Sequence, residues 1–322
     1  MVAHQSIRRP AQVEVGVHPS RQSHGGPPHP YWVGNPTPAC PRGVVGRTMP
    51  RAAQMPAYPT VMEWPVVILG VPFDPMTLAG AVDRIESMVA EGGTHYVVTP
   101  NVDFLVKAQR DPELHDILAR ADLVLCDGKP LVWASQWLGD ALPCRVAGSD
   151  LIPCLLHRAA ERGWRIFLLG GGPGVASEAA QRIAAAHPRL PEIAHYSPPY
   201  RPLGEMNDAE IIGRVREAKP DLMLVCFGCP KQEKWISRHR NELDVPVMIG
   251  AGGTIDFLAA RMARAPVWMR RSGTEWLFRL FQEPGRLARR YADDLLHFLP
   301  AILAQRWRRP SEGAGNSLKG RA

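Results

Sequence analysis

Three side chains able to move protons or hold a sugar stand at or shortly after the ends of apolar runs of this sequence. Asp127 follows the run 123–126, Gln232 follows 222–227, and Asp256 follows 245–250. Apolar runs of this length, broken by glycine or proline, predict buried parallel strands that lead into helices. Ligands of open α/β sheets bind where such strands end, and carboxylates there can act as general acids or bases. The spacing therefore predicts a catalytic site built from strand ends.

Each of these positions also has a simpler interpretation as part of an ordinary turn. Asp127 precedes a glycine and a helix that starts with proline, so it suits helix capping as well as acid–base chemistry. Asn101 suits the cap of the helix after the run 95–99, and Thr99 is a hydroxyl at the end of that run. The pattern of strand, glycine and helix occurs at 222–235 and again at 245–257, which favours a site.

The elements that must position these side chains alternate along the chain. Helical periodicity follows most of the apolar runs, and alternating strands and helices form parallel sheets covered by helices. We therefore expect an α/β fold with a Rossmann-like, mostly parallel sheet flanked by helices and a C-terminal basic helical appendage. The predicted strands are 66–70, 95–99, 123–126, 165–169, 192–195, 222–226 and 245–250.

Composition divides the chain of 322 residues into four segments. Residues 1–60 hold eleven prolines and no sustained periodicity, which predicts a disordered N-terminal extension. Residues 61–260 form the predicted catalytic domain. Residues 261–305 are the predicted appendage, and 306–322 are a predicted disordered basic tail. The region 261–322 holds thirteen Lys or Arg against five Asp or Glu, so it predicts a basic attachment to an acidic body.

Basic and apolar residues are interleaved in this C-terminal region. Arg279, Arg286 and Arg289 are spaced to share one face if the break at Pro284 is gentle. Leucine and aromatic residues of 295–307 stand beside further arginines, which is typical of a segment on anionic lipid. The alternatives are a packed helix with solvated arginines and a nucleic-acid surface, although no nucleic-acid module is visible.

A glycine-rich turn at 170–174 precedes a helix and suits a phosphate. It lacks the G-x-G-x-x-G spacing of dinucleotide-binding folds, and no acidic residue for a ribose ends the next strand. An NAD-type Rossmann oxidoreductase built on this turn is the alternative function. A non-catalytic membrane scaffold is a third interpretation, but it leaves Asp127, Gln232 and Asp256 unexplained.

Cysteine usage and hydropathy indicate a compartment. The six cysteines lie mostly in apolar runs, as free thiols of a reducing compartment do. The pair Cys226-x-x-Cys229 straddles a strand end and lacks a second pair for a zinc site, so we expect no redox or metal role there. No apolar run approaches the ~20 residues of a membrane span, and the N-terminus lacks a signal core. These features predict a cytoplasmic protein.

Six motifs occur in a characteristic order: Thr99-Pro100-Asn101, Asp127-Gly128, the runs 145–150, 228–235 and 250–257, and the segment 264–276. Together they resemble the WecG/TagA/CpsF family of bacterial glycosyltransferases over about 66–291. The resemblance implies an inverting transfer from a UDP-sugar to a polyprenyl-diphosphate-linked saccharide in cell-surface or exopolysaccharide biosynthesis. It implies a peripheral enzyme at the inner face of the cytoplasmic membrane, with the appendage docked near the active site.

The resemblance also implies roles for single residues. Asp127 matches the proposed general base, and Thr99 matches the wall of the sugar pocket beside it. Gln232 matches a glutamine at the donor sugar, and Asp256 matches an acid that contacts the nucleotide. Tyr200 stands where the family often has Gly-Tyr, with Pro199 in place of the glycine. The implied substrate-binding residues are Asn101, Arg145, Tyr200, Gly228, Gln232, Gly252, Gly253 and Asp256.

The departing diphosphate must be stabilised, commonly by a metal ion on an Asp-x-Asp motif. No two aspartates of this chain are separated by a single residue, so we expect no metal and no cofactor besides the UDP-sugar substrate. Arginines would then neutralise the diphosphate or meet the membrane, and the candidates are Arg264, Arg279, Arg286 and Arg289. The sequence does not distinguish among N-acetylmannosamine, its uronic acid and glucose as the donor sugar. A homo-oligomer is also compatible with the sequence.

Overall fold

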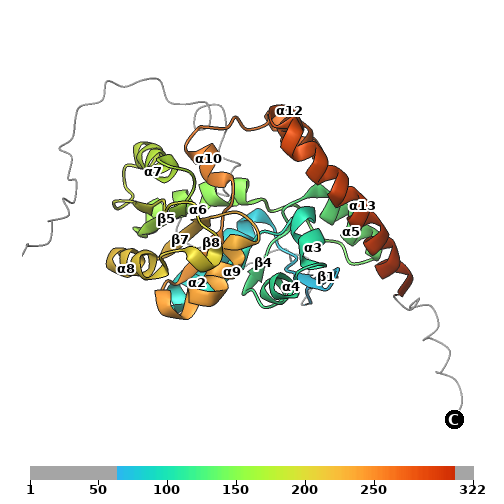
Figure 1. Ribbon diagram of the computed structural model, residues 1–322, viewed down its shortest axis with the longest axis horizontal. Coiled ribbons are helices and arrows are strands. Elements are labelled where there is room, and N and C mark those ends of the chain that lie inside the picture. Colours follow the sequence, from blue (N-terminus) through green and yellow to red (C-terminus); the bar gives the residue numbers. More distant parts are fainter. Residues whose placement is uncertain (1–63, 309–322) are drawn as a thin grey trace, which may run out of the picture.

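The computed structural model describes residues 64–308, without the side chains of Arg271 and Arg286. Its six-stranded sheet has the order β4-β3-β8-β7-β5-β6, and each neighbouring pair is parallel. The expected Rossmann-like α/β fold is confirmed (Figure 1). The predicted extension 1–60 lies outside the described residues. The strands are β3 (His95–Val98), β4 (Leu123–Val124), β5 (Ile166–Gly170), β6 (Ala194–Tyr196), β7 (Leu222–Cys226) and β8 (Val247–Gly250).

Helices cover both faces of this sheet. One face shares a core with α2 (Leu78–Glu91), α6 (Gly148–Arg162), α7 (Val175–Ala186) and α10 (Thr254–Leu258). The opposite face shares a core with α3 (Val102–Ala108), α4 (Pro112–Ala119), α5 (Lys129–Leu138), α8 (Asp208–Ala218) and α9 (Lys231–Leu243). A short 3-10 helix, η1 (Leu203–Glu205), precedes α8. Every residue of β5 and β7 is buried, as their unbroken apolar sequences predict.

The run 66–70 differs from its prediction as a single strand. Val66–Ile68 (β1) pairs with Val71–Phe73 (β2) in a separate antiparallel hairpin and does not join the parallel sheet. The turn between them holds Leu69 at φ 50° and Gly70 at φ 83°. Glycine adopts this left-handed conformation readily, so the chain reverses there. A continuous apolar pattern does not distinguish such a hairpin from one buried strand.

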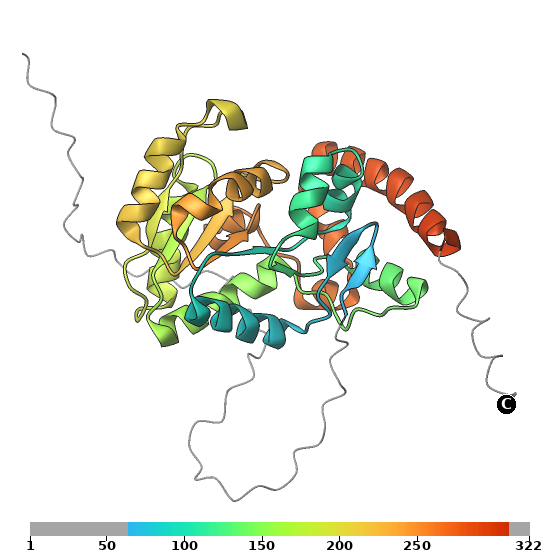
Figure 2. The ribbon, with the colours of Figure 1, turned by 90° about the horizontal axis from the view of Figure 1, so that it is seen from below.

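The C-terminal region forms α11 (Val267–Ser272), α12 (Glu275–Gln282) and α13 (Pro284–Arg308). The long helix α13 runs past α3 and α5, and the two views in Figures 1 and 2 show it along one side of the molecule. Near its end, Gln305 donates to the carbonyl of Val67 and accepts from the amide of Leu69, both at 2.8 Å. These bonds tie the appendage to the β1–β2 hairpin.

The helix α13 is longer than the sequence pattern suggested. The predicted appendage ends at 305, but α13 continues through Pro300 to Arg308 and includes the first three residues of the predicted tail. Phe298 and Ile302 pack into the core on both sides of the proline, which anchors this extension. The rest of the tail lies outside the described residues. Among residues 64–308, no helix is both long and apolar enough to cross a bilayer.

Candidate active site

The strand ends that carry the predicted residues lie side by side. Strands β4, β3, β8 and β7 are consecutive in the sheet, so the segments that follow them meet along one edge. Thr99, after β3, is buried there against the start of α6. A Cβ on Gly148 would lie 3.4 Å from Thr99 Oγ1 and 3.6 Å from Thr254 Oγ1. At these ordinary contact distances, the starts of α6 and α10 lie beside the end of β3.

Asp127 begins the segment after β4, and its amide donates to the carbonyl of Pro100 at 3.0 Å. It does not cap α5, because Gly128 occupies the cap position and no side chain bonds to the first turn. Burial raises the pKa of Asp127 to about 6, even though Arg145 and Arg279 act in the opposite direction. A carboxylate with this pKa is mostly ionised at neutral pH and can accept a proton. The geometry fits the acid–base interpretation better than capping.

Asn101 does act as a helix cap. Its Oδ1 accepts from the amide of Phe104 at 3.3 Å at the start of α3. Asn101 also stands beside the Asp127 loop, since a Cβ on Gly128 would lie 4.0 Å from Asn101 Cβ. Capping uses the amide oxygen and leaves the NH₂ group able to donate to a substrate.

Gln232, which the resemblance places at the donor sugar, makes its hydrogen bonds within the protein. Its side chain is buried, and its Oε1 accepts from the amides of both Gly228 and Gly252 at 3.1 Å. Its Nε2 donates to Glu233 Oε1 at 2.8 Å, which fixes the orientation of the amide. Gln232 therefore joins the ends of β7 and β8. It shapes the loops of the site from within.

Glu233 was not singled out from the sequence, because a glutamate in the first turn of a helix is usually exposed. Here it is fully buried, and burial raises the pKa of its carboxyl to about 7. The only sequence signal is its place beside Gln232 in the 228–235 motif.

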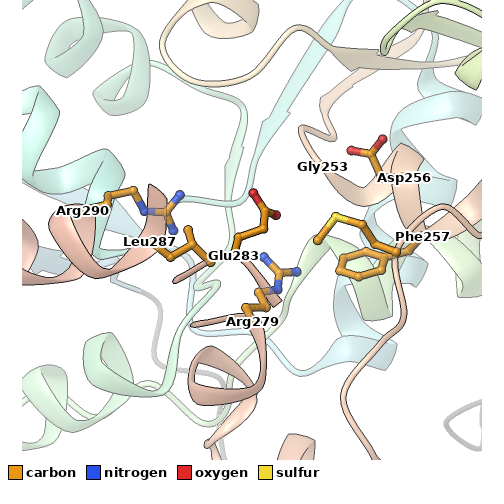
Figure 3. A pocket seen from close by; sticks show the side chains of 8 residues that line it. Gly253, Asp256, Phe257, Arg279, Glu283, Leu287 and Arg290 are labelled. Atoms are coloured by element: carbon orange, nitrogen blue, oxygen red, sulfur yellow. The ribbon is translucent and has the colours of Figure 1, made fainter. Parts of the chain in front are cut away.

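A cavity of about 420 Å³ separates the strand-end edge from the appendage. Figure 3 shows Asp256 and Phe257 on one side and Arg279, Glu283 and Arg290 on the other. The guanidinium of Arg279 lies 4.9 Å from the centre of the Phe257 ring, and its Nε has no hydrogen-bond partner among the described residues. The remaining lining residues are Gly253, Met262 and Leu287.

This cavity contains three of the predicted residues, Gly253, Asp256 and Arg279. Glu283 and Arg290 were missed, because their approach depends on how α12 and α13 fold back over the sheet. Arg279 links the cavity to Asp127, since its charge lowers the pKa of that carboxyl. The combination of a proton acceptor and a nearby guanidinium suits a reaction in which an anionic group departs.

The other predicted arginines are dispersed. Arg145 and Arg264 have side chains only 16% and 6% exposed and are both ion-paired. Arg264 is therefore held inside the protein and is not presented to a membrane. Arg289 is exposed on α13, and the side chain of Arg286 lies outside the described residues. Arg290, the neighbour of Arg289, is the one that lines the cavity.

Tyr200 is 94% exposed, with the ammonium of Lys231 5.0 Å from its ring centre. It can stack on a base but does not line the cavity described above. The glycine-rich turn has a packing explanation: a Cβ on Gly170 would lie 2.8 Å from the carbonyl oxygen of Cys226. Burial raises the pKa values of Cys226 and Cys229, the opposite of what a reactive thiol needs. Among the described residues, no three His, Cys, Asp or Glu side chains form a metal-binding group.

Comparisons with known proteins agree with this arrangement of motifs. The profile of the glycosyl transferase WecG/TagA/CpsF family matches residues 66–312. An N-acetylglucosaminyldiphosphoundecaprenol N-acetyl-beta-D-mannosaminyltransferase of Bacillus spizizenii is 32% identical over 60% of this chain and 74% of its own length. A protein of the same name from Staphylococcus aureus is 30% identical over 70% of this chain and 87% of its own. The chain therefore belongs to the WecG/TagA/CpsF family of glycosyltransferases.

Proposed function

We propose that this glycosyltransferase moves a sugar from a UDP-sugar to a polyprenyl-diphosphate-linked saccharide with inversion at the anomeric carbon. The observation that carries the proposal is Asp127, a carboxyl with a pKa of about 6 at the strand-end edge and within the electrostatic reach of Arg145 and Arg279. Such a group can remove the proton of an acceptor hydroxyl as its oxygen attacks.

The transfer needs a group that takes the acceptor proton and a group that stabilises the departing diphosphate. The acceptor oxygen forms a bond to the anomeric carbon while the bond from that carbon to the β-phosphate oxygen breaks. The hydroxyl proton passes to Asp127, and UDP leaves with the electron pair of the broken bond. Arg279, from the appendage, stabilises the charge on the departing diphosphate. Asp256, on the opposite wall of the cavity, contacts the nucleotide.

We propose N-acetylmannosamine as the donor sugar, with its uronic acid and glucose as the alternatives. The support comes from the two relatives, both of which are named as N-acetylmannosaminyltransferases acting on N-acetylglucosaminyldiphosphoundecaprenol. The acceptor that we propose is accordingly a sugar on a polyprenyl diphosphate. The nicotinamide alternative is not supported, because the chain belongs to a glycosyltransferase family and packing against β7 accounts for Gly170.

A lipid-linked acceptor requires contact with a membrane, and α13 offers a surface for it. Leu295, Leu296 and Leu299 are each at least half exposed on this helix, and Trp307 is 80% exposed near its end. Exposed leucine and tryptophan beside arginine suit the interface of an anionic bilayer. We place the enzyme peripherally on the cytoplasmic membrane through this face, with the cavity close to the lipid headgroups.

Product analysis tests the proposal. The full chain is incubated with UDP-N-acetylmannosamine and a short-chain polyprenyl-diphosphate N-acetylglucosamine, and the lipid product is examined by mass spectrometry and NMR. We expect one added N-acetylhexosamine, with the anomeric configuration opposite to that of the donor. Retention of configuration, or transfer only to water, would contradict the proposed mechanism.

A further inference from the structure

Four buried side chains alternate in charge where the appendage meets the catalytic domain. Arg145 and Asp150 come from the loop before α6 and its first turn, and Arg264 and Glu275 come from the appendage. Arg145 Nη2 lies 2.7 Å from Asp150 Oδ2, and Arg145 Nη1 lies 2.9 Å from Glu275 Oε2. Arg264 Nη2 lies 2.5 Å from Asp150 Oδ1, and Arg264 Nε lies 3.7 Å from Glu275 Oε1. These four residues form an ion-pair ring, and Arg270 of α11 approaches it from outside, with its Nη1 3.8 Å from Asp150 Oδ1.

The ion-pair ring is buried and holds two acidic and two basic groups, with Arg270 as a further, largely buried cation beside Asp150. Its side chains are between 6% and 16% exposed, so each charge depends on the others for compensation. Removal of one member of a buried ion pair leaves an uncompensated charge, which is far more costly than loss of a surface pair. Neutralising any one of the four side chains should therefore destabilise the whole ring. It joins two segments more than one hundred positions apart in the sequence.

The ion-pair ring also adjoins the site described above. Arg145 is the first of the charged groups that act on Asp127, and Glu275 lies one turn before Arg279 on α12. The cavity between Asp256 and Arg279 exists only when the appendage lies against the catalytic domain, because its lining comes from both. A ligand in that cavity contacts both walls.

We propose that the ion-pair ring is a latch in which Asp150, Arg264 and Glu275 are positioning residues that hold the appendage closed over the site. The proposal deepens the proposed function, because the latch acts on the same cavity and on Arg279. Without the latch the closed form becomes a minor fraction of the molecules. A donor that binds only the closed form then binds more weakly in proportion to that fraction, and saturating donor restores closure.

The first test measures closure without any substrate. Hydrogen exchange of the amides of α12 is followed by mass spectrometry in the full chain and in the variants Asp150→Asn and Glu275→Gln. Both should accelerate exchange of α12 at least about tenfold, whereas exchange of β7 should be unchanged. Asp150→Asn is the sharper variant, because it lies in the catalytic domain and not on α12. Wild-type exchange of α12 in both variants would overturn the latch.

The matched control is Glu178→Gln. Glu178 pairs with Arg261, so this pair also joins the appendage to the catalytic domain, but its side chains are 44% and 42% exposed. Exposed pairs contribute little, so this variant should exchange like the wild type. If Glu178→Gln opens α12 as much as Asp150→Asn does, the buried ring has no special role.

The second test is kinetic. With UDP-N-acetylmannosamine and the lipid acceptor, both ring variants should raise the KM for the donor at least about tenfold and leave kcat within about twofold. A drop in kcat at saturating donor with unchanged KM would overturn the latch. Accelerated exchange in the variants, with no transfer from any UDP-sugar by the wild type, would support the latch and refute the proposed function.

Discussion

The substitution Asp127→Asn should remove catalysis and make the protein more stable at neutral pH. Loss of a general base costs roughly 10²–10⁴-fold in rate. Stability should rise because burial lifts the pKa of Asp127 from 3.8 to about 6 in the folded protein. A shift of roughly two units corresponds to an upper limit of about 3 kcal/mol, and partial exposure of the carboxyl reduces the expected gain to about 1–3 kcal/mol.

The sign of this effect depends on pH. A carboxyl whose folded pKa is raised contributes stability below its unfolded pKa, and that contribution is lost as pH rises through the folded pKa. Asparagine resembles the protonated form and does not titrate. The gain in unfolding free energy of Asp127→Asn should therefore be small near pH 4 and complete above about pH 7. Urea unfolding followed by circular dichroism over this range measures it.

Asp111→Asn is a control of opposite sign. Asp111 caps α4 through the amide of Leu114, and its pairing with Lys234 at 2.7 Å lowers the pKa of its carboxyl. Asparagine caps helices equally well, so the variant loses only the ion pair and should be less stable than wild type at neutral pH. If Asp127→Asn is also less stable than wild type at neutral pH, the assignment of Asp127 as a carboxylate that desolvation makes destabilising is wrong.

Three further predictions concern Arg279, Gln232 and the exposed face of α13. The kcat/KM of the wild type should fall as pH drops through about 6. Arg279→Gln should move this fall to higher pH, because the guanidinium of Arg279 lowers the pKa of Asp127. An unchanged pH profile would show that Arg279 does not act on the pKa of Asp127. Gln232→Ala should lower the unfolding free energy by about 1–3 kcal/mol in thermal or urea unfolding, because the amides of Gly228 and Gly252 lose their acceptor. If the variant is as stable as the wild type, Gln232 does not stabilise the junction between the ends of β7 and β8. The double variant Leu295→Ser with Leu296→Ser should sediment less with anionic vesicles but keep its activity on a short-chain acceptor; unchanged sedimentation would exclude this face of α13.

The positions of the polar residues at strand ends could be predicted, because parallel strands end at a common edge. Asp127 and Asp256 are predictable in this way, since Asp127 comes directly after an apolar run and Asp256 comes six residues after another. The helix cap at Asn101 follows from local sequence as well. For these residues, local pattern and sheet topology together determine the place of the side chain.

Features that depend on long-range packing could not be predicted. Arg264 was expected to face diphosphate or lipid, but the return of the appendage places it against Asp150. Glu275 and Arg290 acquire their places in the same way, far along the chain from their neighbours. Gln232 and Glu233 look like exposed residues of a helix start, yet the packing of α9 buries both. The periodicity of a sequence shows which residues are apolar, but it does not show which polar side chains form ion pairs or hydrogen bonds with one another.

The most direct test of the account is acceptor-dependent UDP release from a panel of UDP-sugars, measured with and without EDTA for the wild type and for Asp127→Asn. The account predicts release from one donor, with N-acetylmannosamine first, that resists EDTA and falls by roughly 10²–10⁴-fold in the variant. Wild-type turnover by a folded Asp127→Asn protein would show that Asp127 is not the base. No acceptor-dependent release from any donor would contradict the proposed transfer itself.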